Sequence, residues 1–380
     1  MKNVSILATT DVHGYVDEGL ANLKQVREDL KASLLIDNGD FLIGSSLATY
    51  GYRQSEYTPL VELANEIGYD IMIPGNHDLD FGLEWLLKQV SKLDAEYVCA
   101  NLYDNQGQLI FKPYTTKTIN GVKIAVIGLL TGACSQLATH SSVLDVVVKP
   151  PINELNSLIT QIKQESDLII VAYHGGLTNH PSTGDLWTYP SREDEAYQLM
   201  EQFPDINSLI CGHQHFVNVG IHPSNIALIQ PGTQGKVAGY QAFSFVDENS
   251  VTIVDNKIIQ LNAQVMSFDI RSDYEDWIET PVDLAKVAEY ITEYFPADFH
   301  FLNYTAQTLD DLIADTQGPF PLSRYYLSGE ELADHLDLEG IIDTSKNYNV
   351  IASPGILPDY RIREQYLIPL FDEIVKYQAY

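Results

Sequence analysis

Short apolar runs rich in valine, isoleucine and leucine alternate with amphipathic stretches over residues 4–240 of this 380-residue chain. The apolar runs have the length of buried strands and lie at residues 4–9, 34–36, 70–73, 122–127, 168–172, 209–211 and 227–230. The amphipathic stretches have helical spacing and lie at 18–31, 56–67, 82–92, 151–165 and 192–202. Strands and helices that alternate along a chain pack in layers, because each sheet face must be covered. The pattern therefore predicts an α/β fold with layered sheets.

Five polar clusters lie at or just after the ends of these apolar runs. They are Asp11-Val-His13, Gly39-Asp40, Gly75-Asn76-His77-Asp78, His174-Gly-Gly and Gly212-His213-Gln-His215. In open α/β sheets, ligands bind on the loops that leave the carboxyl ends of the strands. Since each cluster follows a different predicted strand, we expect all five to meet at one site.

The residue types in these clusters predict a site for two divalent cations. Carboxylate, amide and imidazole ligands without cysteine suit Mn, Fe, Zn, Co or Ni. Asp40 is the candidate bridge, because one carboxylate can touch two cations and offset their repulsion. Asp11 and His13 can turn onto one ion, and His213 and His215 can reach different ions.

Such a pair of cations suits phosphoester hydrolysis. Two cations about 3.5–4 Å apart lower the pKa of a bridging water, clamp phosphoryl oxygens and offset charge in an in-line transition state. The expected nucleophile is a metal-bridging hydroxide. A group beside the leaving oxygen is also needed, and His77 is the candidate. A nearby carboxylate would fix the tautomer of this histidine and raise its basicity.

The five clusters together resemble the ordered signature of the calcineurin-like metallophosphoesterases. Three further segments resemble the 5′-nucleotidase / 2′,3′-cyclic-nucleotide 2′-phosphodiesterase family within it: Thr10-Asp-Val-His-Gly, Asp80-Phe-Gly and Glu193-Asp-Glu-Ala-Tyr. The resemblance covers residues 4–240 and implies a four-layer α/β/β/α catalytic domain.

The resemblance also implies two ligand sets that share Asp40. One ion would be bound by Asp11, His13, Asp40 and His215, and the other by Asp40, Asn76, His174 and His213.

In the same resemblance, His77 is the catalytic histidine and pairs with Asp80. In the mechanism that we expect, Asn76 and the two ions steady the equatorial phosphoryl oxygens. The alternative for Asp80 is that it caps the helix that begins near Phe81. Asp78 is assigned no direct role.

The sequence pattern changes after residue 240. Apolar runs there predict hairpins, with turns at Asp247-Glu-Asn and at Asp255-Asn256. Residues 271–380 hold 21 Asp and Glu against 7 Lys and Arg and are expected to be mostly helical. We therefore expect a catalytic domain at 1–270 and a small acidic appendage at 271–380. The resemblance makes this appendage a reduced substrate-binding domain without the family's arginine motif or aromatic clamp.

The formal charge of −30 restricts the partners of this chain. It argues against duplex nucleic acid and an anionic membrane, since both select basic surfaces. No segment approaches the roughly 20 apolar residues that span a bilayer. Three cysteines and no visible signal peptide favour the cytoplasm. The oligomeric state stays open.

The expected substrate is a small phosphoester, foremost a nucleotide, cleaved by a 5′-nucleotidase or 2′,3′-cyclic-nucleotide phosphodiesterase activity. The alternative is a non-catalytic sensor or scaffold that binds metal or nucleotide, which the retention of His77 disfavours. A protein serine/threonine phosphatase is disfavoured, because Asp40 is followed by Phe-Leu-Ile-Gly rather than Arg-Gly. A third alternative is that the acidic C-terminal segment docks a protein partner or a second copy.

Overall fold

The computed structural model divides the chain into two units, Met1–Phe268 and Asp269–Tyr380, each described below by itself. It describes residues 2–16, 19–54, 57–134, 146–187, 192–245, 251–262, 271–282, 284–294, 297–302, 306–308, 310–311, 322–328, 331–333, 343, 345–352 and 362–366. From the sequence, we expect the boundary between the catalytic domain and the C-terminal appendage after residue 270, two residues beyond the division between these units.

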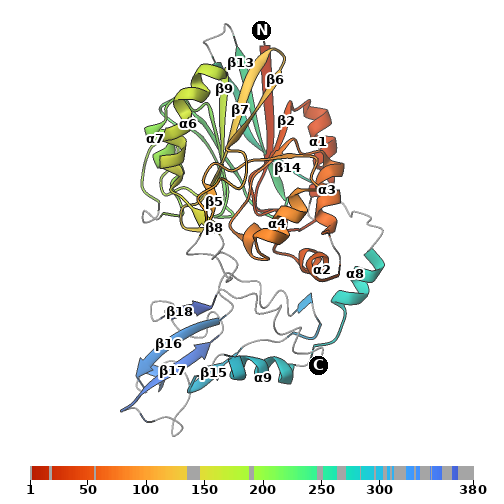
Figure 1. Cartoon of the computed structure of the whole chain (residues 1–380), viewed down its shortest axis with the longest axis vertical. Helices are drawn as coiled ribbons and strands as arrows, with labels where there is room; N and C mark the ends of the chain where they lie inside the picture. The colour runs from red at the N-terminus through yellow and green to blue at the C-terminus, as the bar shows by residue number, and fades with distance from the viewer. Residues whose placement is uncertain are drawn as a thin grey trace. The chain divides into compact units, whose positions relative to one another are not determined.

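The first unit contains two six-stranded sheets (Figure 1). The first sheet has the order β14-β13-β1-β2-β3-β4, in which β1 to β4 are parallel and β13 and β14 antiparallel to their neighbours. Its strands are β1 Lys2–Thr9, β2 Leu34–Asp37, β3 Ile71–Met72, β4 Glu96–Tyr97, β13 Val237–Phe245 and β14 Val251–Gln260.

The second sheet has the order β11-β12-β10-β9-β7-β6, and its four central strands are parallel. Its strands are β6 Tyr114–Ile119, β7 Val122–Leu130, β9 Leu168–His174, β10 Ser208–Cys211, β11 Val217–Ile221 and β12 Ala227–Pro231. A separate antiparallel pair joins β5 Leu102–Asp104 to β8 Val146–Val148. Parallel order brings the carboxyl ends of the central strands to one edge of each sheet.

The two sheets pack face to face, and helices cover their outer faces. One buried cluster joins Ile6 and Ile36 of the first sheet to Val126 and Ile170 of the second. A second cluster joins the outer face of the second sheet to the helices α6 Pro151–Glu165 and α7 Ala196–Gln202. Figure 1 shows α1 and α3 against the outer side of the first sheet. The predicted four-layer α/β/β/α sandwich is confirmed.

The other helices among the described residues of this unit are α1 Leu23–Leu30, α2 Ser46–Gln54, α3 Pro59–Ile67 and α4 Leu83–Val90, with short 3₁₀ turns at Leu20–Asn22 and His77–Leu79. The helix α6, which confirms the helix predicted at 151–165, follows from its local sequence. It begins at Pro151, where proline is tolerated in the first helical turn, and it buries Leu155, Ile159 and Ile162. Each such side chain contributes roughly 1.5–3 kcal/mol when fully buried.

One predicted turn is wrong. Asp255 and Asn256 lie inside β14, which runs without interruption from Val251 to Gln260. The register shifts opposite Ala242 and Phe243, so that Val254 is an extra, exposed residue on β14. This β-bulge accommodates the polar residues that the sequence pattern assigns to a turn. The turn predicted at Asp247-Glu-Asn lies outside the described residues.

The described residues of the second unit form two helices and a four-stranded sheet of order β15-β17-β16-β18. These elements are α8 Arg271–Ile278, α9 Leu284–Tyr294, β15 Phe299–Phe301, β16 Leu322–Ser328, β17 Asn347–Ala352 and β18 Ile362–Tyr366. Its described part is therefore mixed, which corrects the expectation of a mostly helical region. In β16, Tyr325 and Leu327 are buried and Tyr326 between them is exposed, an alternation typical of a strand.

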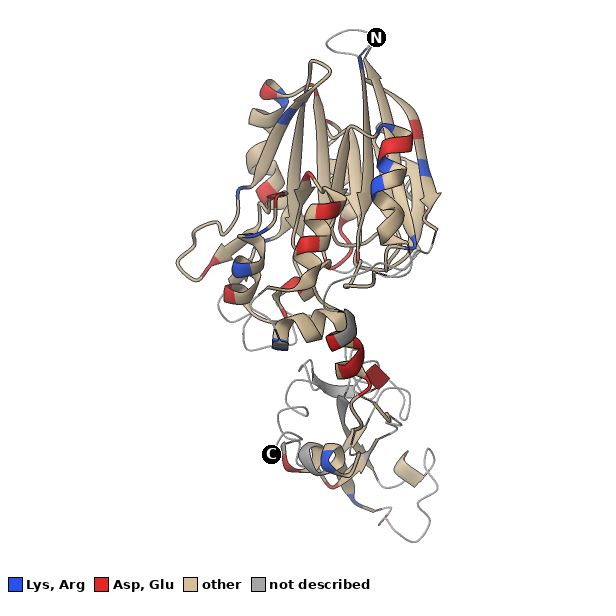
Figure 2. Ribbon diagram, turned by 90° about the vertical axis from the view of Figure 1, so that its right-hand side faces the viewer, with Lys and Arg blue, Asp and Glu red and all other residues tan. Residues whose placement is uncertain are grey.

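Charged residues of the chain lie mostly on helices and loops, while the strands of the two large sheets are mostly uncharged (Figure 2). Among the described residues, none of the helices is both long and apolar enough to cross a bilayer.

Candidate metal centre

The seven predicted ligands come together where the two sheets of the first unit meet. Four lie on loops that leave β1, β2 and β3 of the first sheet, and three lie at the ends of β9 and β10 of the second. In order, they are Asp11, His13, Asp40, Asn76, His174, His213 and His215. Residues up to 202 positions apart in sequence thus become hydrogen-bonding neighbours.

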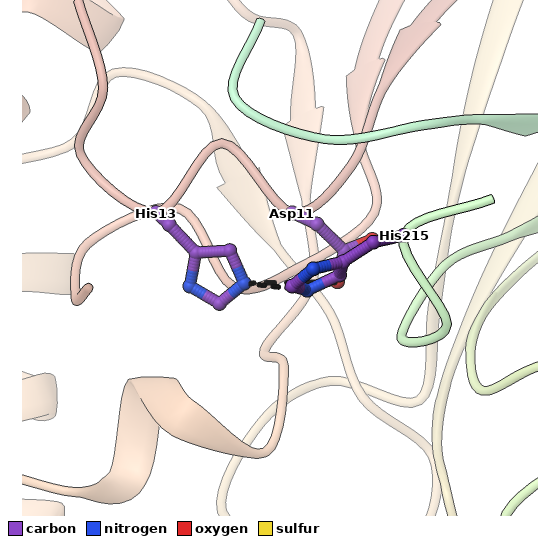
Figure 3. A group of neighbouring side chains, drawn as sticks. All are labelled: Asp11, His13 and His215. Carbon is purple, nitrogen blue, oxygen red and sulfur yellow. Dashed lines mark hydrogen bonds and ion pairs between the residues drawn. The ribbon is translucent and has the colours of Figure 1, made fainter. Parts of the chain in front are cut away.

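The Asp11 group consists of Asp11, His13 and His215 (Figure 3). The Nε2 atoms of His13 and His215 are 3.0 Å apart. Asp11 Oδ1 lies 3.4 Å from Nε2 of His215 and 3.9 Å from Nε2 of His13. Asp40 Oδ2 completes the set at 3.8 Å from His13 Nε2.

The Asn76 group consists of Asn76, His174 and His213. Asn76 Oδ1 lies 3.2 Å from His174 Nε2 and 2.9 Å from His213 Nδ1. Asp40 Oδ2 lies 3.1 Å from His174 Nε2, so the same oxygen faces both groups. Asp40 therefore occupies the position that the sequence predicts for a bridge.

The donor atoms of both groups fit divalent cations. Asp11 and Asp40 are fully buried, and a buried carboxylate must be paired or bind a metal. Among the described residues, every ion pair of these two carboxylates is with a histidine, and none is with lysine or arginine. Imidazole nitrogens that face each other and two buried carboxylates are the ligands that these ions prefer.

The backbone at the site is held in an unfavourable conformation. Five of the predicted ligands have positive φ: Asp11 at 50°, His13 at 53°, Asp40 at 55°, His213 at 72° and His215 at 59°. Non-glycine residues rarely adopt this region, and each instance costs of order 1–3 kcal/mol. Such strain persists where the surrounding structure enforces it, often at functional sites.

Two glycines allow the loops to approach each other. A Cβ on Gly75 would lie 2.0 Å from Asp40 Oδ1, and one on Gly39, whose φ is 92°, would lie 2.8 Å from His174 Nδ1. Any side chain at these positions would displace the ligands.

Without bound cations, His174 and the buried carboxylates Asp40 and Asp11 hold each other in their charged forms. Burial acts to raise the pKa of Asp40, but His174 and His77 outweigh it and hold that pKa well below its usual range. Burial likewise acts to lower the pKa of His174, and Asp40 and Asp11 raise it to about 10. Protons thus provide the positive charge that cations would otherwise supply.

His77 and Asp80 form the predicted pair. His77 Nδ1 lies 2.8 Å from Asp80 Oδ2, and the His77 backbone N–H donates to Asp40 Oδ1 at 2.8 Å. Burial acts to lower the pKa of His77, whereas Asp80 and Asp40 raise it to about 9. Asp80 is not the N-cap residue of α4, which is Gly82.

Asp78, which is assigned no direct role from the sequence, connects two of the loops. Its buried carboxylate accepts hydrogen bonds from the backbone N–H groups of Asp40, Leu42 and Gly75 at 2.9, 3.0 and 2.9 Å. Burial and the nearby Asp40 raise its pKa to about 6. Its position next to His77 was the available signal, but contacts over 38 residues cannot be deduced from spacing.

Comparison with known proteins places the chain in a family. The profile named calcineurin-like phosphoesterase matches residues 4–217. The chain is 28% identical over 256 residues to the trifunctional nucleotide phosphoesterase YfkN of Bacillus subtilis, covering 58% of this chain and 17% of that protein. It is 32% identical over 187 residues to the 5′-nucleotidase of Vibrio cholerae, covering 46% of this chain and 34% of that protein. The chain thus spans between 17% and 34% of the length of these two relatives.

Solved structures show the same fold. A putative 5′-nucleotidase of Staphylococcus aureus, in complex with alpha-ketoglutarate, superposes with a TM-score of 0.78 at 21% identity, covering 99% of this chain and 96% of that one. The NAD nucleotidase of Haemophilus influenzae superposes with a TM-score of 0.68 at 18% identity, covering 99% of this chain and 97% of that one. Because the family profile covers more than half of the sequence, we conclude that this chain belongs to the calcineurin-like phosphoesterase family.

Proposed function

We propose that the chain is a dinuclear-metal hydrolase of small phosphoesters, foremost a nucleotide, of the 5′-nucleotidase or 2′,3′-cyclic-nucleotide phosphodiesterase type. The observation that carries this proposal is the position of Asp40, whose Oδ2 lies 3.1 Å from His174 and 3.8 Å from His13. A carboxylate shared by two ligand groups is what a two-cation site requires. The names of the relatives support nucleotides as substrates.

Each ligand group would hold one divalent cation together with Asp40. One ion would be bound by Asp11, His13, Asp40 and His215, and the other by Asp40, Asn76, His174 and His213. When bound, such a pair of cations activates water near neutral pH and neutralises phosphoryl oxygens.

His77 is the group that handles the proton of the leaving oxygen. Asp80 Oδ2 accepts from His77 Nδ1–H, so Nε2 is the nitrogen left to face the substrate. The ion pair with Asp80 favours the protonated ring. In that form, Nε2–H can donate a proton to an alkoxide that departs in line with attacking water.

Asn76 has a second role in this proposal, as a hydrogen-bond donor to the substrate. Its Oδ1 faces His174 and His213, which leaves the amide N–H₂ as a donor. An amide donor in a fixed orientation steadies a phosphoryl oxygen as charge develops on it.

The test is hydrolysis of a panel by Mn²⁺-loaded protein. The panel is bis-p-nitrophenyl phosphate, p-nitrophenyl phosphate, AMP, UDP-glucose and 2′,3′-cyclic AMP. Asp40→Asn removes the shared carboxylate, and Asp205→Asn, at a surface pair with Lys163, is the matched control. We expect metal-dependent turnover that Asp40→Asn abolishes and Asp205→Asn preserves. Two bound ions without turnover of any ester would contradict the proposal and favour a sensor or scaffold.

A further inference from the structure

Three of the histidines at the site each present one ring nitrogen to the other ligands and direct the second elsewhere. His13 Nδ1 lies 2.9 Å from the carbonyl oxygen of Ile43, and His174 Nδ1 lies 2.7 Å from that of Asn38. A carbonyl can only accept, so each Nδ1 carries the proton and each Nε2 is free to bind an ion. Backbone atoms thus fix the tautomers of these two rings.

His213 is oriented the opposite way and faces a different partner. Its Nδ1 is directed at Asn76, and its Nε2 lies 3.6 Å from Glu193 Oε2. Apart from the proposed ligands Asp11 and Asp40, Glu193 is the only carboxylate among the described residues that forms an ion pair with a ligand histidine.

The fold holds Glu193 in place. Its backbone oxygen accepts hydrogen bonds from the Tyr173 hydroxyl at 3.0 Å and from Gly176 N at 3.3 Å. Tyr173 is fully buried at the end of β9, directly before His174. A Cβ on Gly176 would lie 2.1 Å from the Gln214 side chain, so the loops on either side are tightly packed. The segment that carries Glu193 is therefore anchored beside both histidine loops.

We propose that Glu193 is a positioning residue for His213. It accepts the Nε2 proton, fixes the ring tautomer and directs the Nδ1 lone pair toward the ion of the Asn76 group. The inference rests on the proposed function, because it assigns a role next to one of its two cations. A carboxylate is a stronger acceptor than the carbonyls that orient His13 and His174, so it makes the bound imidazole a better donor. The two cations then depend unequally on Glu193.

The test is isothermal titration calorimetry, in which Mn²⁺ is added to metal-free protein and the affinity for each ion is measured. In Glu193→Ala we expect one of two Mn²⁺ ions to bind roughly 10–100-fold more weakly, with the other unchanged. Glu193→Gln should lose less, because its amide oxygen still accepts from Nε2. Wild-type affinity for both ions in Glu193→Ala would overturn the inference.

Glu201→Gln is the matched control. Glu201 Oε1 lies 2.9 Å from His222 Nε2, a histidine–carboxylate contact of the same kind that involves none of the proposed ligands. We expect both Mn²⁺ affinities to be unchanged in this variant. An equal loss in Glu201→Gln and Glu193→Ala would reduce the effect to a general loss of stability and overturn the positioning role.

If the wild type binds two ions but hydrolyses no ester, the proposed function fails while this inference stands.

Discussion

The two ligand groups that share Asp40 differ in how far solvent reaches them. In the Asp11 group the His215 side chain is 47% exposed, whereas in the Asn76 group His174 is 0% exposed. Electrostatic attraction is stronger where water is excluded. We therefore infer that the Asn76 group binds its cation more tightly and that the Asp11 group exchanges its cation more readily.

The groups also differ in what orients them. Asp11 receives a hydrogen bond from Thr10 Oγ1 at 2.6 Å, and His13 is held by a backbone carbonyl. In the Asn76 group, an amide and a carboxylate side chain face His213. Because Glu193 contacts only His213 among the proposed ligands in the described residues, replacing Glu193 should weaken the Asn76 group selectively.

The largest expected effect comes from removing what the groups share. Asp40→Asn deprives both cations of their common ligand, and turnover should fall by roughly 10⁴-fold because several kcal/mol of charge stabilisation is lost. Metal analysis of the purified variant should show loss of both ions. Retention of one tightly bound ion would show that Asp40 serves only one group.

His77→Asn should separate chemistry from cation binding. Loss of the proton donor is expected to lower kcat by roughly 10³-fold. Both cations should remain bound, since His77 belongs to neither group. Steady-state kinetics together with calorimetry checks this. Equal losses in kcat and in cation affinity would contradict the role of His77.

Because the His174 side chain is buried and that of His215 is half exposed, we expect unequal losses of cation affinity when each is replaced by asparagine. His174→Asn should weaken cation binding at least roughly tenfold more than His215→Asn, because the buried contact is screened less by water. Mn²⁺ titration of the two variants measures the difference. Equal losses, or a larger loss in His215→Asn, would refute the proposed ranking of the groups.

Asp78→Asn should have a smaller effect on both groups. The asparagine amide can accept through only one oxygen, so at least one of the three backbone N–H groups loses its partner, at about 1–3 kcal/mol. Urea denaturation measures that loss of stability. An unchanged midpoint would show that Asp78 does not hold the two loops together.

Metal-free protein should lose stability at alkaline pH. The pKa values of His77 and His174 are raised to about 9 and about 10 in the fold. The stability that these two protonated histidines contribute is present in full below the pKa of histidine in the unfolded chain, about 6.5. It is lost as the pH rises through 9 to 10. The pKa values of the Asp11 and Asp40 carboxyl groups are lowered, so their contribution to stability is present above about pH 4 and is lost only in acid.

Urea denaturation between pH 6 and pH 10 checks this trend. With Mn²⁺ bound, the trend should weaken or reverse, because cations bind the deprotonated ligands. In His174→Asn the alkaline loss should be smaller. A metal-free protein whose stability rises from pH 6 to pH 10 would contradict the charge arrangement of the Asn76 group.

The sequence contained most of the fold because its strongest signals are local. The helix predicted at 151–165 matches α6, and Asp40, Asn76 and His213 follow strands as expected. By contrast, α2 was not predicted, since Gly51 interrupts its pattern. A Cβ on Gly51 would lie 2.6 Å from Thr58 Oγ1, so packing against the chain before α3 determines this helix.

The parts that could not be predicted depend on contacts distant in sequence. The roles of Asp78 and Glu193 arise from hydrogen bonds and ion pairs that form only after the sheets have packed. The sheet of the second unit was missed because its acidic composition obscured short alternating strands such as β16.

The most direct test of the central claim is anomalous diffraction from crystals grown with Mn²⁺. We predict two peaks about 3.5–4 Å apart, both in contact with Asp40. One should be bound by the Asp11 group and the other by the Asn76 group. A single peak, or two peaks that do not share Asp40, would contradict the account.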